Sequence, residues 1–250
     1  EIKIKSIYSI IFLLVTMIKP QEIYSEFKLF NYIEVLKNIQ NEKILAPVHI
    51  RIKPTNLCNH DCWYCAYRSS NVQLGNNMQI RDKLPYDKFN EIAENIIEMG
   101  VEAVTFSGGG EPLLYKKLPL IIEKLAKGGV KIAALTNGSN LKGNMALAFQ
   151  KYGTWIRISI DGYDDKSYSK SRGIKDNSFS KLLGNIKKFT STDTKCIVGC
   201  SLIIDNSNYK HIYELCLKLK IIGVKNVKIS GVVIGNTAEE NKQYHSQIKG

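Results

Sequence analysis

The strongest constraint on the fold is a repeated alternation of segments with strand periodicity and segments with helix periodicity. Residues 48–53 alternate apolar and polar side chains as a strand does, whereas residues 86–99 place apolar side chains at helical spacing. Strands paired through intervening helices run parallel with right-handed crossovers, so the sequence predicts an α/β fold with a parallel sheet. Six strands are predicted, at residues 48–53, 101–106, 131–136, 155–160, 196–204 and 224–234. Helices are predicted at residues 86–99, 118–127, 144–152, 179–189 and 209–222, and a sixth helix is weak or missing.

Length and composition fit this interpretation. A chain of 250 residues can bury a sizeable core, and α/β barrels of this length form one domain. The chain has 44% hydrophobic and 23% charged residues with six cysteines, which excludes disorder, collagen and a small disulfide scaffold. Its net charge of +12 suits either an anionic partner or solubility.

The N-terminal residues precede the first predicted strand. Residues 7–18 are mostly apolar after Lys3 and Lys5, as in the apolar part of a signal peptide, but no cleavage site follows. The stretch is also shorter than the ~18 residues that span a bilayer. We therefore expect residues 1–46 to be an N-terminal helical extension with no membrane role, and residues 47–250 to be the core domain.

Polar or glycine-rich segments directly follow four of the predicted strands. They cover residues 58–65, 107–112, 136–138 and 159–162. In a parallel α/β sheet, ligands bind at the carboxyl ends of the strands. The sequence therefore predicts that these four segments meet in one binding site.

The first segment carries three cysteines in a C-x3-C-x2-C spacing, Cys58, Cys62 and Cys65, with Tyr64 before the last. Thiolates are soft ligands for zinc or for iron–sulfur clusters. A structural zinc site needs a fourth ligand, for which His60 or a distant cysteine is available. An iron–sulfur cluster held by three cysteines keeps one iron open for another ligand. The remaining thiols, Cys196, Cys200 and Cys216, have the pattern of core residues.

Two further segments have chemistry suited to a charged ligand. Glycines 108–110 permit a sharp turn and close backbone approach, and Glu111 places a carboxylate beside them for a ligand ammonium. Arg157, Ser159 and Asp161 share one strand face by period two.

Together these motifs resemble the radical S-adenosylmethionine (SAM) superfamily, whose signature is C-x3-C-x2-C with an aromatic residue before the last cysteine. The resemblance implies a partial (β/α)6 TIM-like barrel with an N-terminal helical extension. It implies a [4Fe–4S] cluster on Cys58, Cys62 and Cys65 whose open iron binds SAM. Delivery of one electron then cleaves SAM to a 5′-deoxyadenosyl radical, which abstracts hydrogen from an unidentified substrate.

The resemblance also assigns cofactor-binding residues. Glycines and Glu111 would hold the SAM amino group, Ser159 the ribose or carboxylate, and Arg172 the carboxylate, while Leu202 would pack on adenine. The full set of expected SAM contacts is Tyr64, Gly109, Gly110, Glu111, Thr136, Asn137, Ser159, Asp161, Arg172 and Leu202. Arg51 and Lys53 share a face of the first strand, where they would be costly inside a barrel without an anionic partner, so they are expected to contact substrate.

Partners and compartment follow from the same resemblance. A flavodoxin or ferredoxin is the expected electron donor, and an oxygen-sensitive cluster favours the cytoplasm. The motifs are closest to the branch with the molybdenum-cofactor cyclase and the SPASM-type maturases, so we expect a catalytic core whose C-terminal region is missing. The alternative is a non-catalytic iron–sulfur or zinc protein that binds nucleic acid through its +12 charge. That alternative needs neither Glu111 nor the Ser159 and Arg172 pair, so nucleic acid is not the expected partner.

Overall fold

The computed structural model describes residues 30, 32–68, 78–175 and 177–246. The chain divides into two compact units, Glu1–Pro47 and Val48–Gly250, each described here by itself. In the first unit, α2 (Ile33–Gln40) is an α-helix with no buried side chain. It is part of the predicted N-terminal extension, whereas the helix predicted over residues 7–18 lies outside the described residues.

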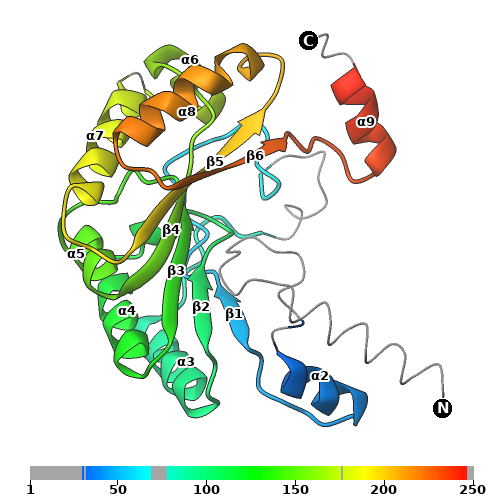
Figure 1. The fold of residues 1–250 in the computed structure, drawn as a ribbon, viewed down its shortest axis with the longest axis vertical. Coiled ribbons are helices and arrows are strands. Elements are labelled where there is room, and N and C mark those ends of the chain that lie inside the picture. Colours follow the sequence, from blue (N-terminus) through cyan, green and yellow to red (C-terminus); the bar gives the residue numbers. More distant parts are fainter. Residues whose placement is uncertain (1–29, 31, 69–77, 176, 247–250) are drawn as a thin grey trace. The chain divides into compact units, whose positions relative to one another are not determined.

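A six-stranded parallel sheet organises the second unit, with the strands in chain order from one edge to the other. The predicted α/β fold and the partial six-strand barrel are confirmed, and the sheet is open because β1 and β6 form its two edges (Figure 1). The strands are β1 (His49–Ile52), β2 (Ala103–Phe106), β3 (Lys131–Thr136), β4 (Gly153–Ser159), β5 (Ile197–Ile204) and β6 (Asn226–Gly231).

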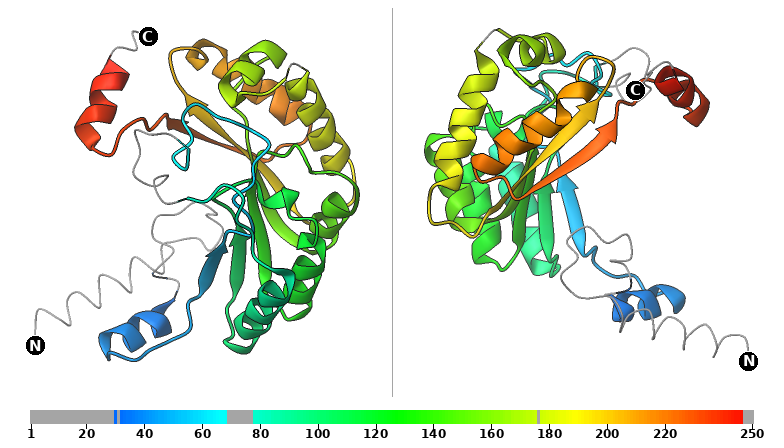
Figure 2. Two further views of the ribbon diagram at one scale, coloured as in Figure 1. Left: turned by 180° about the vertical axis from the view of Figure 1, so that it is seen from behind. Right: turned by 45° about the horizontal axis from the view of Figure 1, so that its top comes forward.

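Helices cover one face of this sheet (Figure 2). Those between the strands are α3 (Tyr86–Glu98), α4 (Leu118–Lys127), α5 (Gly143–Tyr152), α6 (Asp165–Arg172), α7 (Ser178–Thr190) and α8 (Ile212–Ile221). Two short 3₁₀ turns, η3 (Pro112–Leu114) and η4 (Tyr209–His211), follow β2 and β5. The chain continues past β6 into α9 (Ala238–Ser246).

The sequence did not predict α6, and it indicated α9 weakly at most. Neither helix has an apolar stripe, so hydrophobic periodicity does not reveal them. The signal for α6 lies at its start, where the Asp164 carboxylate accepts from the Ser167 backbone N–H and the Ser167 hydroxyl accepts from the Asp164 backbone N–H. This reciprocal pair is a capping box, which fixes a helix start without hydrophobic help.

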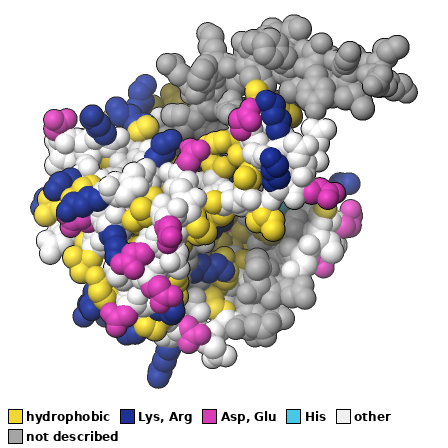
Figure 3. All heavy atoms as spheres, turned by 90° about the horizontal axis from the view of Figure 1, so that it is seen from below, with side chains coloured by type: hydrophobic (Ala, Val, Ile, Leu, Met, Phe, Trp, Pro, Cys, Tyr) yellow, Lys and Arg dark blue, Asp and Glu magenta, His cyan; other side chains and the backbone are white. Residues whose placement is uncertain are grey.

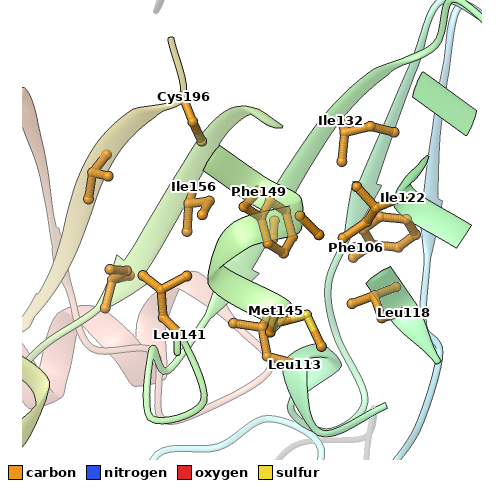
Figure 4. Packing of buried hydrophobic residues seen from close by; sticks show 14 of the residues in the cluster. Phe106, Leu113, Leu118, Ile122, Ile132, Leu141, Met145, Phe149, Ile156 and Cys196 are labelled. Atoms are coloured by element: carbon orange, nitrogen blue, oxygen red, sulfur yellow. The ribbon is translucent and has the colours of Figure 1, made fainter. Parts of the chain in front are cut away.

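The hydrophobic core lies between the sheet and its helices. Alternate residues of the central strand β4, such as Ile156 and Ile158, are buried in it, and Ile160 continues the pattern. Phe149 of α5 packs among residues from the sheet and from α4, including Ile132 and Ile122 (Figure 4). Since side chains alternate across a strand, the intervening residues point to the opposite face, which we call the inner face.

The surface carries charges of both signs. Lys and Arg side chains are interspersed with Asp and Glu side chains on the face seen from below (Figure 3). No helix in the described ranges is both long enough and apolar enough to span a bilayer.

Candidate functional site at the carboxyl edge of the sheet

The three motif cysteines lie in the loop that follows β1, which we call the cysteine loop (residues 53–68). All three are half-buried free thiols. The loop turns tightly where the Cys65 N–H donates to the Cys62 carbonyl at 3.0 Å. The loop also contacts α6, which lies between β4 and β5 in the chain. The Asp61 N–H donates to the carbonyl of Arg172, the last residue of α6, at 2.8 Å.

The glycine run after β2 lies directly against the cysteine loop. The Gly110 N–H donates to the Thr55 carbonyl at 3.0 Å, and the Glu111 N–H donates to the Leu57 carbonyl at 2.8 Å. A Cβ atom at position 110 would lie 2.0 Å from the Leu57 carbonyl oxygen, and Gly109 has a φ of 68°. These glycines are therefore required for backbone approach between two loops, whatever ligand they also contact.

Substitution of Gly110 by Ala should separate the two loops. The added methyl would clash with backbone that cannot move aside cheaply, so we expect a loss of about 1–3 kcal/mol in the free energy of unfolding. Chemical denaturation followed by circular dichroism measures this loss. Gly184→Ala is the matched control, because Gly184 lies within α7 and a Cβ there meets nothing within 4 Å. That control should be neutral or stabilising, and an equal loss in both variants would contradict the close-approach argument.

Glu111 is a buried carboxylate that joins β2, η3 and β3. Its Oε1 accepts from the Leu113 N–H at 2.9 Å and from the Thr136 hydroxyl at 2.5 Å, and its Oε2 accepts from the Asn137 N–H at 2.6 Å. Burial raises the pKa of Glu111, while these three donors favour the charged form. A carboxylate offers about four acceptor positions, so the three protein donors leave room for one more donor.

The turn after β3 is also tied to the cysteine loop. The Asn137 side-chain amide donates to Asn59 Oδ1 at 2.9 Å, and the Asn59 amide donates to the Ser139 hydroxyl at 2.9 Å. Thr136 and Asn137 thus lie beside both Glu111 and the cysteine loop. The sequence analysis did not identify Asn59, since an Asn between two cysteines has no distinctive spacing.

A buried ion pair lies on the other side of the cysteine loop. Arg172 Nη2 is 2.5 Å from Asp161 Oδ2, and both side chains are at least 95% buried. The Tyr64 hydroxyl donates to the same Asp161 oxygen, and Arg172 Nη1 donates to Cys62 Sγ at 3.5 Å. Burial opposes the charge of Arg172, but Asp161 and the other acidic groups around the guanidinium together hold its pKa well above its ordinary value.

The ion pair and its hydrogen bonds bring four predicted site residues into one cluster: Tyr64, Asp161, Arg172 and Cys62. Tyr168, which has no predicted role, and His60, the candidate fourth zinc ligand, border it. Tyr168 is buried, with Arg172 Cζ 5.6 Å from its ring centroid. His60 is also buried, and its pKa falls to about 3 because of burial and the nearby charge of Arg172.

Ser159 and Leu202 do not share a face. Ser159 pairs in register with Ser201, and the two hydroxyls are 3.4 Å apart, so both point to the inner face. Leu202 is one residue further along β5 and is buried in the core, where it lines a small cavity with Leu215 of α8. The expectation that Leu202 meets a cofactor is not supported by this placement. Its neighbour Ile203 lies on the face of Ser159, and the Ile203 N–H donates to Asp161 Oδ1 at 2.8 Å.

Arg51 and Lys53 lie on the inner face of the chain around β1. Both side chains are exposed. Arg51 is in register with Thr105 of β2. Lys53 Nζ is 4.5 Å from the centroid of the Tyr67 ring, at the end of the strand near the glycine run.

The thiols are not gathered around one point. Within the described ranges, no three His, Cys, Asp or Glu side chains come close enough to hold a single metal ion. Cysteines that bind a multinuclear cluster bond to different irons and need a wider arrangement than ligands of one ion. Whether a [4Fe–4S] cluster fits the cysteine loop therefore depends on the chemistry of the donor atoms and not on convergence of the thiols at one point.

Comparison with known proteins identifies the family of the chain. The family model of the radical SAM superfamily matches residues 52–219, which is more than half of the chain. The chain belongs to the radical SAM superfamily. Radical SAM proteins are enzymes that use a [4Fe–4S] cluster and SAM, and the matched segment contains the cysteine loop, the glycine run and the Asp161–Arg172 pair.

Radical SAM relatives of two kinds share sequence with this chain. An S-adenosylmethionine-dependent nucleotide dehydratase of Lacinutrix mariniflava is 34% identical over 113 residues, covering 45% of this chain and 23% of the relative. A GTP 3′,8-cyclase of Psychromonas ingrahamii is 28% identical over 162 residues, covering 64% of this chain and 45% of the relative. The chain thus spans less than half the length of either relative.

Solved radical SAM structures share the fold. Streptococcus suis SuiB bound to S-adenosylmethionine matches with a TM-score of 0.63 at 18% identity, over 90% of this chain and 54% of SuiB. A structure of anSMEcpe with bound AdoMet matches with a TM-score of 0.58 at 19% identity, over 75% of this chain and 50% of that chain. At these identities the likeness concerns the fold.

The residues of this radical SAM chain fit the cluster in their chemistry. Three unpaired thiols come from one loop, and protein donors already point at two of the sulfur atoms. Cys58 Sγ accepts from the His60 N–H at 3.5 Å, and Cys62 Sγ accepts from Arg172. Hydrogen bonds of this kind compensate the negative charge of cluster thiolates. Arg68 also stabilises the loop, since its guanidinium donates to the His60 carbonyl at 2.8 Å and to Asp61 at 3.1 Å.

Proposed function

We propose that this chain binds a [4Fe–4S] cluster through Cys58, Cys62 and Cys65 and catalyses reductive cleavage of SAM to a 5′-deoxyadenosyl radical, which abstracts hydrogen from a substrate. The observation that carries the proposal is the hydrogen-bonded contact of four separate motifs with one loop. The glycine run, the turn after β3, Asp161 and Arg172 all bond to the cysteine loop. A protein that only stored a metal would not need these strand ends to meet.

Each group of side chains has a proposed task. The remaining acceptor position of Glu111 receives the SAM ammonium, while its bonds to Leu113, Thr136 and Asn137 hold it still. Ser159 on the inner face donates to the ribose or carboxylate of SAM. Arg172 pairs with the Asp161 carboxylate and places its own charge toward the SAM carboxylate, and Asp161 orients Tyr64 beside the cysteines.

Partners and compartment belong to the same proposal. A reduced flavodoxin or ferredoxin supplies the electron, and the cytoplasm supplies the reducing conditions that free thiols require. The relatives are a nucleotide dehydratase and a GTP cyclase, whereas SuiB has been solved bound to a precursor peptide.

The test is anaerobic reconstitution with iron and sulfide, followed by reduction in the presence of SAM. We expect about four irons per chain and formation of 5′-deoxyadenosine that requires the reductant. Liquid chromatography with mass spectrometry measures the product, and omission of the reductant is the control. Binding of a single zinc with no SAM cleavage would overturn the proposal in favour of a non-catalytic metal site.

A further inference from the structure

The inner face of the sheet carries cations from three strands and from the start of the cysteine loop. Arg51 and Lys53 lie at the β1 edge, Arg157 at the centre in β4, and Lys228 at the other edge in β6. We propose that this face binds a substrate bearing several phosphate groups. The inference rests on the proposed function, because it names the substrate class for the same site.

Strand register shows that these cations share one face. Ser159, Ser201 and Lys228 are consecutive register partners across β4, β5 and β6. The contact between the Ser159 and Ser201 hydroxyls places that row on the inner face. Arg157 precedes Ser159 by two residues and is therefore on the same face. At the other edge, Arg51 is the register partner of Thr105, and Lys53 follows Arg51 by two residues.

Few negative charges oppose these cations. Within the six strands, all of which lie in the described residues, no inner-face position holds Asp or Glu. Asp161 continues the inner-face series beyond β4, but its carboxylate is paired with Arg172. Burial and the charge of Arg51 together lower the pKa of His49, the next inner-face residue of β1. The positive charge of Arg51 thus acts on His49, a titratable neighbour at this edge.

The face is rich in hydrogen-bond donors. Guanidinium and ammonium groups donate and do not accept, and hydroxyls from Ser159, Ser201 and Ser230 add further donors. Gly199 lies between Arg157 and Asn226 in the register, where a Cβ would come within 2.2 Å of the Asn226 side chain. The Asn226 side chain therefore packs over Gly199, beside Arg157 in the register.

This set of cationic and hydroxyl groups suits a phosphate ligand better than a peptide. Phosphate oxygens are acceptors, and arginine matches them with two parallel hydrogen bonds. A peptide backbone presents donors and acceptors in equal number, so a set dominated by cationic donors matches it less well. Several phosphates on one molecule would meet the separated cations together.

The experiment uses the full chain with its cluster reconstituted and SAM present. Isothermal titration measures binding of inorganic tripolyphosphate and of a panel of nucleoside triphosphates, and a poly-glutamate peptide serves as the acidic-peptide arm. We expect tripolyphosphate to bind, and Arg51→Ala to weaken its Kd by about tenfold because one charge-assisted contact is lost. The Arg51→Ala/Lys228→Ala double variant should lose about a hundredfold if the two sites act independently. Lys188→Ala removes an exposed cation on the helix side and should leave Kd unchanged.

The outcomes separate this inference from the proposed function. Tight binding of nucleoside triphosphates above tripolyphosphate identifies a nucleotide, and equal binding identifies the phosphate groups alone as the recognised element. A wild-type chain that cleaves SAM but binds no phosphate probe, or prefers the acidic peptide, overturns the inference alone. A chain that binds tripolyphosphate but never cleaves SAM overturns the proposed function and leaves the anion site. Equal weakening by Lys188→Ala would show non-specific charge attraction and would also overturn the inference.

Discussion

A Cys62→Ala variant is expected to lose the iron–sulfur cluster while keeping its fold. Cys62 is at the centre of the motif, and its sulfur is the one that Arg172 contacts. A cluster held by three thiolates has no spare cysteine within the loop, so removal of one should abolish stable binding. The measurement is iron and acid-labile sulfide per chain after anaerobic reconstitution, with circular dichroism to verify the fold.

Cys216→Ala is the matched control for this prediction. Cys216 is a half-buried free thiol of α8, outside the cysteine loop, and its pKa is raised by burial. Its loss should leave the iron and sulfide content of the wild type. Stoichiometric iron in the Cys62→Ala protein, or equal loss in both variants, would show that the cysteine loop is not the ligand set.

A Glu111→Ala variant is expected to lose both stability and SAM affinity. Removal of the carboxylate leaves three buried donors without their acceptor, from Leu113, Thr136 and Asn137. Each unsatisfied buried group costs about 1–3 kcal/mol, so the free energy of unfolding should fall by roughly 3 kcal/mol or more. SAM should bind at least about tenfold more weakly because the contact to its ammonium is lost.

Two measurements keep these effects apart. Denaturant unfolding gives the stability loss, and equilibrium dialysis with labelled SAM gives the affinity at a temperature where the variant is fully folded. The cluster should remain, since Glu111 is not a cysteine ligand. Glu91→Ala removes an exposed glutamate of α3 that pairs with Lys88, and it should change neither quantity appreciably. Unchanged SAM affinity in folded Glu111→Ala would remove this residue from the cofactor site.

Much of the architecture is predictable because it follows from local patterns. The alternation around Ile156 and Ile158 fixes both the strand and its buried face, and the glycines after β2 predict a close approach. The core-facing position of Leu202 was not predictable in this way, because it depends on the register that pairs the preceding residue, Ser201, with Ser159. At the end of β5, consecutive residues on both faces of the strand are apolar. Only the register with β4 therefore reveals which of them faces inward.

Partner choice inside the site was not predictable. Arg172 was expected to hold a ligand carboxylate, and the structure pairs it with Asp161, eleven residues earlier in the chain, and with Cys62 in another loop. The helix that carries Arg172 has no apolar stripe, so its position depends on the capping box and on tertiary contacts. Hydrogen bonds between loops, such as Asn59 with Asn137, leave no periodic trace in a single sequence.

The bond from Arg172 to Cys62 also has a consequence for biosynthesis. The two residues are 110 positions apart, so this contact cannot form until most of the catalytic core has left the ribosome. Until then, the cysteine loop lacks both the guanidinium beside its central sulfur and the carbonyl of residue 172 that binds Asp61. The emerging chain therefore exposes three thiols before their protein environment exists. Cluster delivery is best timed after translation has passed α6, and a cell that makes this protein must keep those thiols reduced in the interval.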